Sequence, residues 1–280
     1  MALTAYYLGC PGWGEKTWVG RLFPPGTKDK DFLARYAEVF NTVEGNTTFY
    51  ALPAADTVAR WRAAVPDTFR FCFKFPRTIS HDRFLSNCES ELREFLARIA
   101  PLGETIGTLF VQLPPAFGVA ALPKLRAFLD ALPREHSYGV EVRDEALLAS
   151  TELMEMLTER GVDLVNMDTR GIQATTNPAL AEVRGRKPAL PVIHRATAAR
   201  PFVRFVPHET WGESAAHATE WADVVARWLG AGKRPYFFMH APDDTFAPEN
   251  AYAFHALLRA RAEVGELPPW PGTPKQLALL

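Results

Sequence analysis

One unit recurs along the chain: an apolar extended segment, a polar loop and an amphipathic helix, roughly every 30–40 residues. Strand patterns that alternate with helix patterns indicate βαβ units and a parallel sheet. Eight such units in 280 residues predict an α/β fold, a TIM-barrel-like (β/α)8 architecture with a parallel eight-stranded barrel. The rival, an open doubly wound sheet, lacks its dinucleotide-binding fingerprint here. The expected strands are 6–10, 42–50, 70–75, 108–113, 138–143, 162–168, 202–206 and 236–240.

The expected helices follow from apolar residues spaced at three and four positions. They cover 29–40, 56–65, 89–99, 122–132, 144–160, 214–229 and 251–264. Residues 169–200, called the excursion below, are polar and rich in proline, and we expect at most a short helix near 179–183. We expect one domain over 1–280, with a tail at 266–280 that packs on the barrel outside or frays.

Composition and charge limit the cellular location and the partners that we expect for this chain. The chain is 48% hydrophobic, which is enough for a sizeable core, and its net charge of −1 gives no field toward nucleic acid or membrane. No segment approaches the roughly 18–20 apolar residues of a membrane span. The three cysteines form no disulfide or zinc pattern. We therefore expect a cytoplasmic protein with no membrane association, no nucleic-acid partner and no cofactor.

The segment RFCFKF at 70–75 shows how the strands are built. Phe71, Phe73 and Phe75 share one face of a strand, and Lys74 lies on the other. A lysine there is costly to bury unless it has a partner or opens onto a polar cavity. The other strands show a similar alternation, so we expect their apolar positions, including Val165 and Met167, to face the helices. The alternate positions then point into the barrel.

Those inward positions are polar late in each strand, at the carboxyl end, where barrel enzymes build their sites. Arg77 and His81 follow on a loop above that end. The predicted ring consists of Glu44, Lys74, Gln112, Glu141, Arg143, Asp168, Arg204 and His240, and Asn46 is a further inward position predicted to bind substrate. The alternative is a purely structural network, in which Glu44 neutralises Lys74 and Glu141 neutralises Arg143. We favour a ligand site, because stability alone does not require all these groups at one end.

The cations of this ring suit a small anionic ligand, because guanidinium groups bind carboxylate and phosphate with two hydrogen bonds. They are Lys74, Arg143 and Arg204, with Arg77 above them. The predicted partner is therefore a small molecule that is anionic or polyhydroxyl.

Glu44 and Glu141 are the predicted acid and base of an enzyme that works without a fixed metal. Lys74, flanked by cations, is a further catalytic candidate that can form a Schiff base if its pKa is lowered. A charged Lys74 held by Glu44 is the favoured interpretation of the two.

Two alternatives stay open. Glu44, Glu141, Asp168 and His240 come from four strands and would suit a divalent-metal hydrolase or isomerase, possibly one acting on a phosphodiester. The cations at the same carboxyl ends count against that alternative, and so does the absence of a HxH or HxxxH spacing. No metal is therefore expected. The other alternative is a protein that binds a ligand without turning it over.

The ordered motifs GCPGW, FNTVEGNTTFYALP, TVARWRAAVPDTFRFCFKFPRTISH, LFVQLPP and YGVEVRD resemble the domain of unknown function 72 family, the YecE-like proteins. The match is close over residues 6–168 and weaker beyond. The resemblance implies a TIM-barrel-like fold and no established activity. It adds Trp13 and Tyr50 to the predicted substrate-binding residues. The family pattern covers Gly12, Trp13, Glu44, Asn46, Thr48, Phe49, Tyr50, Lys74, Pro76, His81, Gln112, Pro114, Pro115, Glu141 and Arg143.

Overall fold

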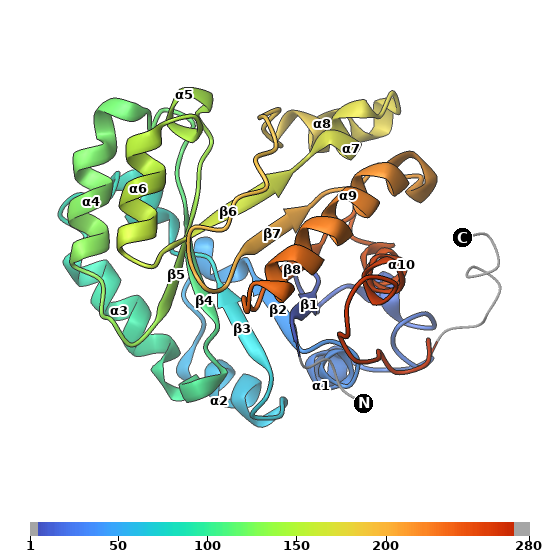
Figure 1. Cartoon of the computed structure of the whole chain (residues 1–280). Coiled ribbons are helices and arrows are strands. Elements are labelled where there is room, and N and C mark those ends of the chain that lie inside the picture. Colours follow the sequence, from blue (N-terminus) through green and yellow to red (C-terminus); the bar gives the residue numbers. More distant parts are fainter. Residues whose placement is uncertain (1–4, 272–280) are drawn as a thin grey trace.

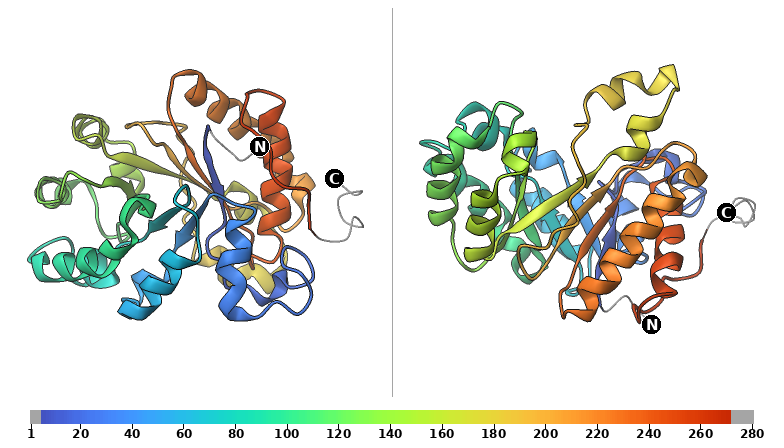
Figure 2. Two further views of the ribbon diagram at one scale, coloured as in Figure 1. Left: turned by 90° about the horizontal axis from the view of Figure 1, so that it is seen from below. Right: turned by 45° about the horizontal axis from the view of Figure 1, so that its top comes forward.

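The computed structural model describes residues 5–271 and places parallel strands at the centre with helices around them (Figures 1 and 2). Each of the eight strands in this part of the chain overlaps one of the expected apolar segments. They are β1 (Tyr7–Gly9), β2 (Thr42–Gly45), β3 (Arg70–Phe73), β4 (Thr108–Gln112), β5 (Ser137–Glu141), β6 (Asp163–Asp168), β7 (Phe202–Phe205) and β8 (Tyr236–Met239).

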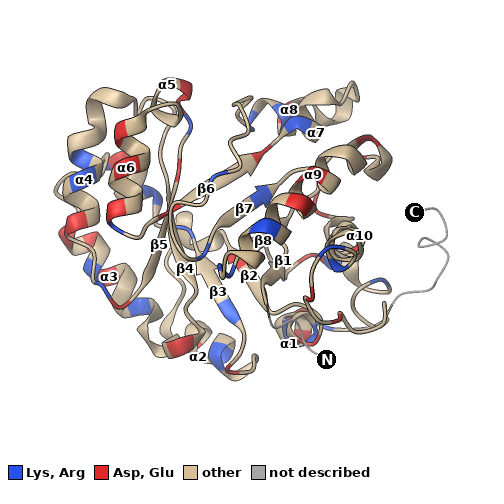
Figure 3. Ribbon diagram, viewed as in Figure 1, with Lys and Arg blue, Asp and Glu red and all other residues tan. Residues whose placement is uncertain are grey.

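The helices lie outside the strands, and the longer ones bury an apolar stripe. In α3, for example, Leu92, Phe95 and Ile99 are buried, and these positions recur on one face of a helix. Figure 3 shows acidic and basic residues over the outer helices α3, α4 and α6. The helices are α1 (Phe32–Ala37), α2 (Ala55–Ala63), α3 (Glu89–Ile99), α4 (Leu122–Asp130), α5 (Glu145–Leu148), α6 (Thr151–Glu159), α7 (Arg170–Ala174), α8 (Ala181–Gly185), α9 (Trp211–Gly230) and α10 (Ala247–Arg259).

The strands divide into two sheets. Six follow the order β1-β8-β7-β6-β5-β4, and β2 pairs with β3 alone. Backbone hydrogen bonds connect β3 with β4, from Phe75 N–H to the Phe110 carbonyl (2.9 Å) and from Gly107 N–H to the Phe71 carbonyl (2.8 Å). The barrel prediction is therefore confirmed in part. The strands are parallel and wrapped by helices, but regular pairing does not run through all eight as one closed sheet.

Between β1 and β2, side chains supplement a backbone hydrogen bond from Glu44 N–H to the Cys10 carbonyl (3.1 Å). The hydroxyl of Tyr36 accepts from Cys10 N–H (2.7 Å) and donates to the Thr42 carbonyl (2.9 Å). The Asn41 amide makes two further hydrogen bonds to the β1 backbone, each of 2.9 Å. A Cβ on Gly9 would lie 2.2 Å from the Thr42 carbonyl oxygen, so this close approach needs glycine.

Apolar residues fill two regions, one on each side of the strands. The larger lies between strands and helices and includes Phe71, Phe73 and Phe75, as the alternation predicted. The smaller lies inside the strands and consists of Tyr7, Cys72, Phe110, Val165, Phe202, Tyr236 and Phe238. Val165 was expected on the helix side, so the predicted facing of β6 is wrong.

Local boundaries differ from the expectation where polar residues can cap or turn the chain. The helix expected over 144–160 is two helices, because the Ser150 hydroxyl accepts from Leu153 N–H and starts α6 anew. The segment 42–50 was expected to hold a strand and its exit; the strand ends at Gly45, and the short helix η3 (Thr47–Phe49) forms the exit. The excursion holds α7 and α8, one helix more than expected.

No helix in residues 5–271 is long and apolar enough to cross a membrane. Of the expected tail, 266–271 is described and the remainder lies outside the described residues.

Candidate active site at the carboxyl ends of the strands

Arg204 of β7 lies at the centre of the polar interior, with 5% of its surface exposed. Its guanidinium donates to both carboxylate oxygens of Glu44, at 2.6 and 2.8 Å, and to Glu141 Oε2 at 2.5 Å. Glu44 comes from β2 and Glu141 from β5, so one side chain connects three strands across the interior. Two carboxylates supply the hydrogen bonds that a buried guanidinium needs.

Both carboxyl groups are held ionised. Burial alone would raise the pKa of Glu141, but Arg143 and Arg204 lower it to about 2. Burial would likewise raise the pKa of Glu44, but Arg204 and His240 hold it well below its ordinary value. His240 Nε2 lies 3.3 Å from Glu44 Oε2, and Asn46 Nδ2 donates to Glu44 Oε1 at 2.6 Å.

The network reaches β3 through a neutral amide. Arg143 donates to Glu141 Oε1 (2.5 Å) and to Gln112 Oε1 (2.9 Å). Gln112 and Glu141 are opposite each other in the β4–β5 register, which brings their side chains together. Lys74 Nζ donates to the same amide oxygen at 2.8 Å.

Lys74 is a buried amine without a carboxylate partner among the described residues. Its side chain is largely enclosed (8% exposed for the residue), and Nζ lies 3.6 Å from the centroid of the Phe49 ring. Burial lowers the pKa of Lys74 to about 7, and Arg204 and Arg143 add to that effect while Glu141 opposes it. The predicted pairing of Lys74 with Glu44 is wrong, because Arg204 takes both oxygens of Glu44.

A cavity of about 460 Å³ opens above Lys74 and Arg204. His81 reaches it from the π-helix η4 (Thr78–Asp82), with its ring edge-on to Phe49 and its Nδ1 2.8 Å from the Ser80 hydroxyl. Burial and the Lys74 charge lower the pKa of His81. The cavity is lined by Asn46, Phe49, Tyr50, Lys74, Arg77, His81, Gln112, Arg143, Val183, Arg186, Lys187, Arg204, Ala241, Pro242 and Asp244.

The comparisons with known proteins agree with this fold and with the motifs. The model of a family described as "Protein of unknown function DUF72" matches residues 7–275. The chain belongs to this family.

Among the relatives of this DUF72 chain, the UPF0759 protein YecE of Escherichia coli strain K12 is 40% identical over 272 residues, covering 95% of this chain and 97% of the relative. A solved DUF72 structure from Thermotoga maritima has a TM-score of 0.71 at 23% identity and covers 91% of this chain and 99% of its own. Another from Enterococcus faecalis has a TM-score of 0.68 at 21% identity, with 94% and 98% covered. These structures share the fold.

Most of the predicted ring of this DUF72 protein comes together. Eight of the predicted residues line the cavity: Asn46, Tyr50, Lys74, Arg77, His81, Gln112, Arg143 and Arg204. Glu44, Glu141 and His240 lie in the hydrogen-bonded network around Arg204.

Asp168 and Trp13 do not take the predicted places. Asp168 Oδ2 accepts from Trp221 of α9 (2.8 Å) and from Arg170 (2.7 Å), so this carboxylate faces the helix layer. Trp13 packs edge-on against Trp61, at 5.2 Å between ring centroids, and covers the apolar outer layer. Neither residue lines the cavity.

The set proposed for a metal does not assemble in the described part of the chain. No group of three or more His, Cys, Asp or Glu side chains there could hold an ion. Arg204 lies between Glu44 and Glu141, and Asp168 faces away from them.

Three charged residues of the cavity were missed from the sequence, Arg186, Lys187 and Asp244. Lys187 follows α8 in the excursion, where no strand periodicity marks an inward position. Asp244 follows β8 in the turn APDD, and its backbone has φ 59°, a left-handed conformation that is uncommon for aspartate. A non-glycine residue in that region beside a cavity suggests a functional constraint.

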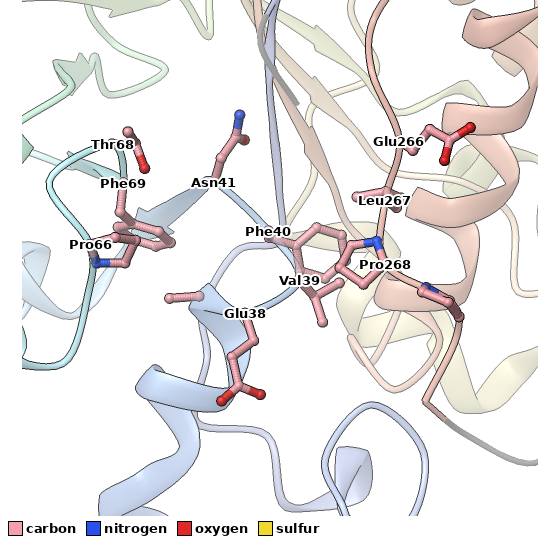
Figure 4. A pocket seen from close by; sticks show the side chains of 12 residues that line it. Glu38, Val39, Phe40, Asn41, Pro66, Thr68, Phe69, Glu266, Leu267 and Pro268 are labelled. Atoms are coloured by element: carbon pink, nitrogen blue, oxygen red, sulfur yellow. The ribbon is translucent and has the colours of Figure 1, made fainter. Parts of the chain in front are cut away.

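A second cavity, of about 410 Å³, lies at the opposite end of the strands (Figure 4). Its walls come from the chain before β2 and β3 and from the segment after α10, and they are mostly apolar, with the carboxylates of Glu38 and Glu266. Among the residues that the structure describes, no cation lines this cavity. It differs in this respect from the cavity at the carboxyl ends, whose lining includes lysine and arginine side chains.

Proposed function

We propose that the protein is an enzyme that binds a small anionic or polyhydroxyl substrate in the cavity at the carboxyl ends of its strands, without a fixed metal. The proposal treats the eight strands as one barrel whose mouth carries the site. The observation that carries it is Lys74, an amine inside a polar cavity whose hydrogen bond goes to a neutral amide.

Lys74 is the anion-binding group in this proposal. Its ammonium form predominates below its pKa of about 7 and lies in the same cavity as the guanidinium of Arg143. His81, whose pKa is lowered, is the neutral base that can accept a proton from the bound substrate.

Glu44 and Glu141 take a different role from the acid and base first expected of them. Carboxyl groups held ionised by Arg204 and Arg143 are poor proton donors at neutral pH. We propose that they fix the two guanidinium groups in place for the substrate. Such support from neighbouring groups keeps a site in its productive geometry.

The test is anion binding by Lys74→Met, with Lys124→Met as the matched control. Lys124 is an exposed lysine whose amine also lies over a phenylalanine ring, Phe84, at 5.2 Å. We expect phosphate and glycerate to raise the melting temperature of the wild type and of Lys124→Met, and to leave that of Lys74→Met unchanged. Because Lys74 is charged below its pKa, the shift should be larger at pH 6 than at pH 8.

Equal anion shifts in all three proteins would contradict the proposal. Restoration of catalysis by Mn²⁺, Mg²⁺ or Zn²⁺ after chelation would favour the metal-dependent alternative. Binding without any turnover across a substrate panel would favour a ligand-binding protein.

A further inference from the structure

The excursion brings a second lysine to the mouth of the strands. It leaves β6 and forms α7 and α8, which stand above the carboxyl end of that strand (Figures 1 and 2). Val183, Arg186 and Lys187 from this segment line the same cavity as Lys74, although they are more than one hundred positions away in sequence. The excursion therefore forms one wall of the site.

Hydrogen bonds hold the backbone of Lys187 in this position. Gln173 Nε2 donates to the Lys187 carbonyl at 3.0 Å, and the Thr169 hydroxyl donates to the Pro188 carbonyl at 2.6 Å. Arg184 Nη1 ties α8 back to the Thr175 carbonyl at 2.6 Å. A segment fastened at these points places its lysine without help from the ammonium group itself.

The ammonium of Lys187 makes no hydrogen bond or ion pair within residues 5–271. Its side chain is half-buried, and burial together with the Arg204 charge lowers its pKa, while Asp244 and Glu44 oppose that effect. A buried cation without a partner is costly, so an anion that enters the cavity removes that cost.

The remaining charges of the cavity are already matched. Arg204 and Arg143 are paired with Glu44 and Glu141, Arg77 lies 3.2 Å from Asp82, and Arg186 is paired with Glu182. Two ammonium groups are left without a carboxylate bond, those of Lys74 and Lys187. The one carboxylate in the lining is Asp244, whose Oδ1 accepts from Ala241 N–H and whose pKa is raised by burial.

We propose that Lys74 and Lys187 together bind a doubly charged oxyanion and that the substrate is a small phosphomonoester. This inference rests on the proposed function. Lysine binds phosphate as a compact point charge, and two of them balance a dianion. Asn46, Gln112 and Asp244 then offer hydrogen bonds to the hydroxyl groups of the rest of the molecule. A cavity of about 460 Å³ is in the size range of small-molecule sites.

The experiment measures the affinity of the full chain for glycerol phosphate, glycerate, malonate and glycerol by calorimetry. The variants are Lys187→Ala and, as the matched control, Lys124→Ala, which removes the same charge from an exposed lysine that does not line this cavity. We expect the wild type to bind glycerol phosphate at least tenfold more tightly than glycerate. Lys187→Ala should lose about tenfold for glycerol phosphate and less than twofold for glycerate, and Lys124→Ala less than twofold for both.

Equal losses in Lys187→Ala and Lys124→Ala would overturn the assignment of Lys187. Malonate bound as tightly as glycerol phosphate would overturn the phosphomonoester class. Anion binding that depends on Lys74 but not on Lys187 would leave the proposed function intact and refute only this inference. A wild type that binds none of the anions would refute both. Melting temperatures of the variants report whether each is folded.

Discussion

The two ends of the strand interior differ in whether their buried polar groups have hydrogen-bond partners. At the mouth, the charges of Arg204, Glu44 and Glu141 are buried but fully paired, and they lie under a cavity. At the amino end, which we call the floor, the first residues of β4, β6 and β8 are Thr108, Asp163 and Tyr236. Each has a buried side-chain oxygen without a hydrogen-bond partner among the described residues.

This contrast distinguishes the mouth, which holds the candidate site, from the floor, which only supports the fold. The floor is closed by apolar packing, as in the stack of Tyr7 on Tyr236 at 4.4 Å between ring centroids. Its few polar atoms weaken the fold, and Thr108, Asp163 and Tyr236 line neither of the two cavities described above. The mouth carries buried charges, although apolar residues in their place would often stabilise the fold equally well. Charges that are both costly and gathered beside a cavity indicate a functional role.

The largest effect is expected from Arg204→Met. This change leaves Glu44 and Glu141 buried without their main partner, so the free energy of unfolding at pH 7 should fall by about 3–5 kcal/mol. Both carboxyl groups have a pKa in the folded state below that in the unfolded state. Their contribution is therefore present above about pH 4.5 and is lost as pH falls. Urea unfolding at pH 7 and pH 4 should show the gap to wild type narrowing.

Arg60→Met is the control, because Arg60 makes an exposed ion pair with Asp56 on α2. Loss of such an exposed pair costs far less than loss of a buried one, because water screens its charges. If Arg204→Met cost no more than the control, the mouth would not be the tightly paired network described, and the contrast with the floor would fail.

Asp163→Asn should act in the opposite direction. Burial raises the pKa of Asp163 to about 7, and the N–H groups of Arg200 and Ala198 offset only part of that effect. A group with a raised pKa in the folded state contributes stability below its unfolded pKa, and this is lost as pH rises toward 7. Between pH 5 and pH 8 the wild type should lose about 1–3 kcal/mol relative to Asp163→Asn.

Chemical denaturation at the two pH values measures this difference. The control is Asp130→Asn, where an exposed aspartate bound to Arg160 has a lowered pKa and should give no relative gain at pH 8. Parallel pH dependence in wild type and Asp163→Asn would mean that the floor carboxyl is ionised and has found a partner.

The alternation of residues predicted the mouth well where a strand has one clearly apolar face. In β7, Val203 and Phe205 face the helices and Arg204 the interior, so the sequence placed this guanidinium correctly. The strand β6 is different, because both of its faces carry apolar and polar residues. Which face of β6 packs against the helices then depends on partners from other elements. Here Trp221 of α9 donates a hydrogen bond to Asp168.

The partners within the mouth were harder to predict than its location. Glu44 and Lys74 are on paired strands, which suggested that they bind each other. Arg204 reaches Glu44 from across the interior instead, 160 positions away, so their pairing depends on how β2 and β7 are placed in the fold. Lys187 carries no strand pattern, since its place depends on backbone hydrogen bonds of the excursion.

The smallest effect is expected from Tyr236→Phe, compared with Tyr6→Phe. Both tyrosines are fully buried, but the Tyr6 hydroxyl lies 2.7 Å from His255 Nδ1, whereas that of Tyr236 has no partner among the described residues. Removing a bonded hydroxyl should lower the free energy of unfolding by about 1 kcal/mol, and removing an unpaired one should raise it by about 0.5–1 kcal/mol. Thermal and urea unfolding measure the two signs, and equal losses in both variants would mean that the Tyr236 hydroxyl is hydrogen-bonded and that the floor is as well satisfied as the mouth.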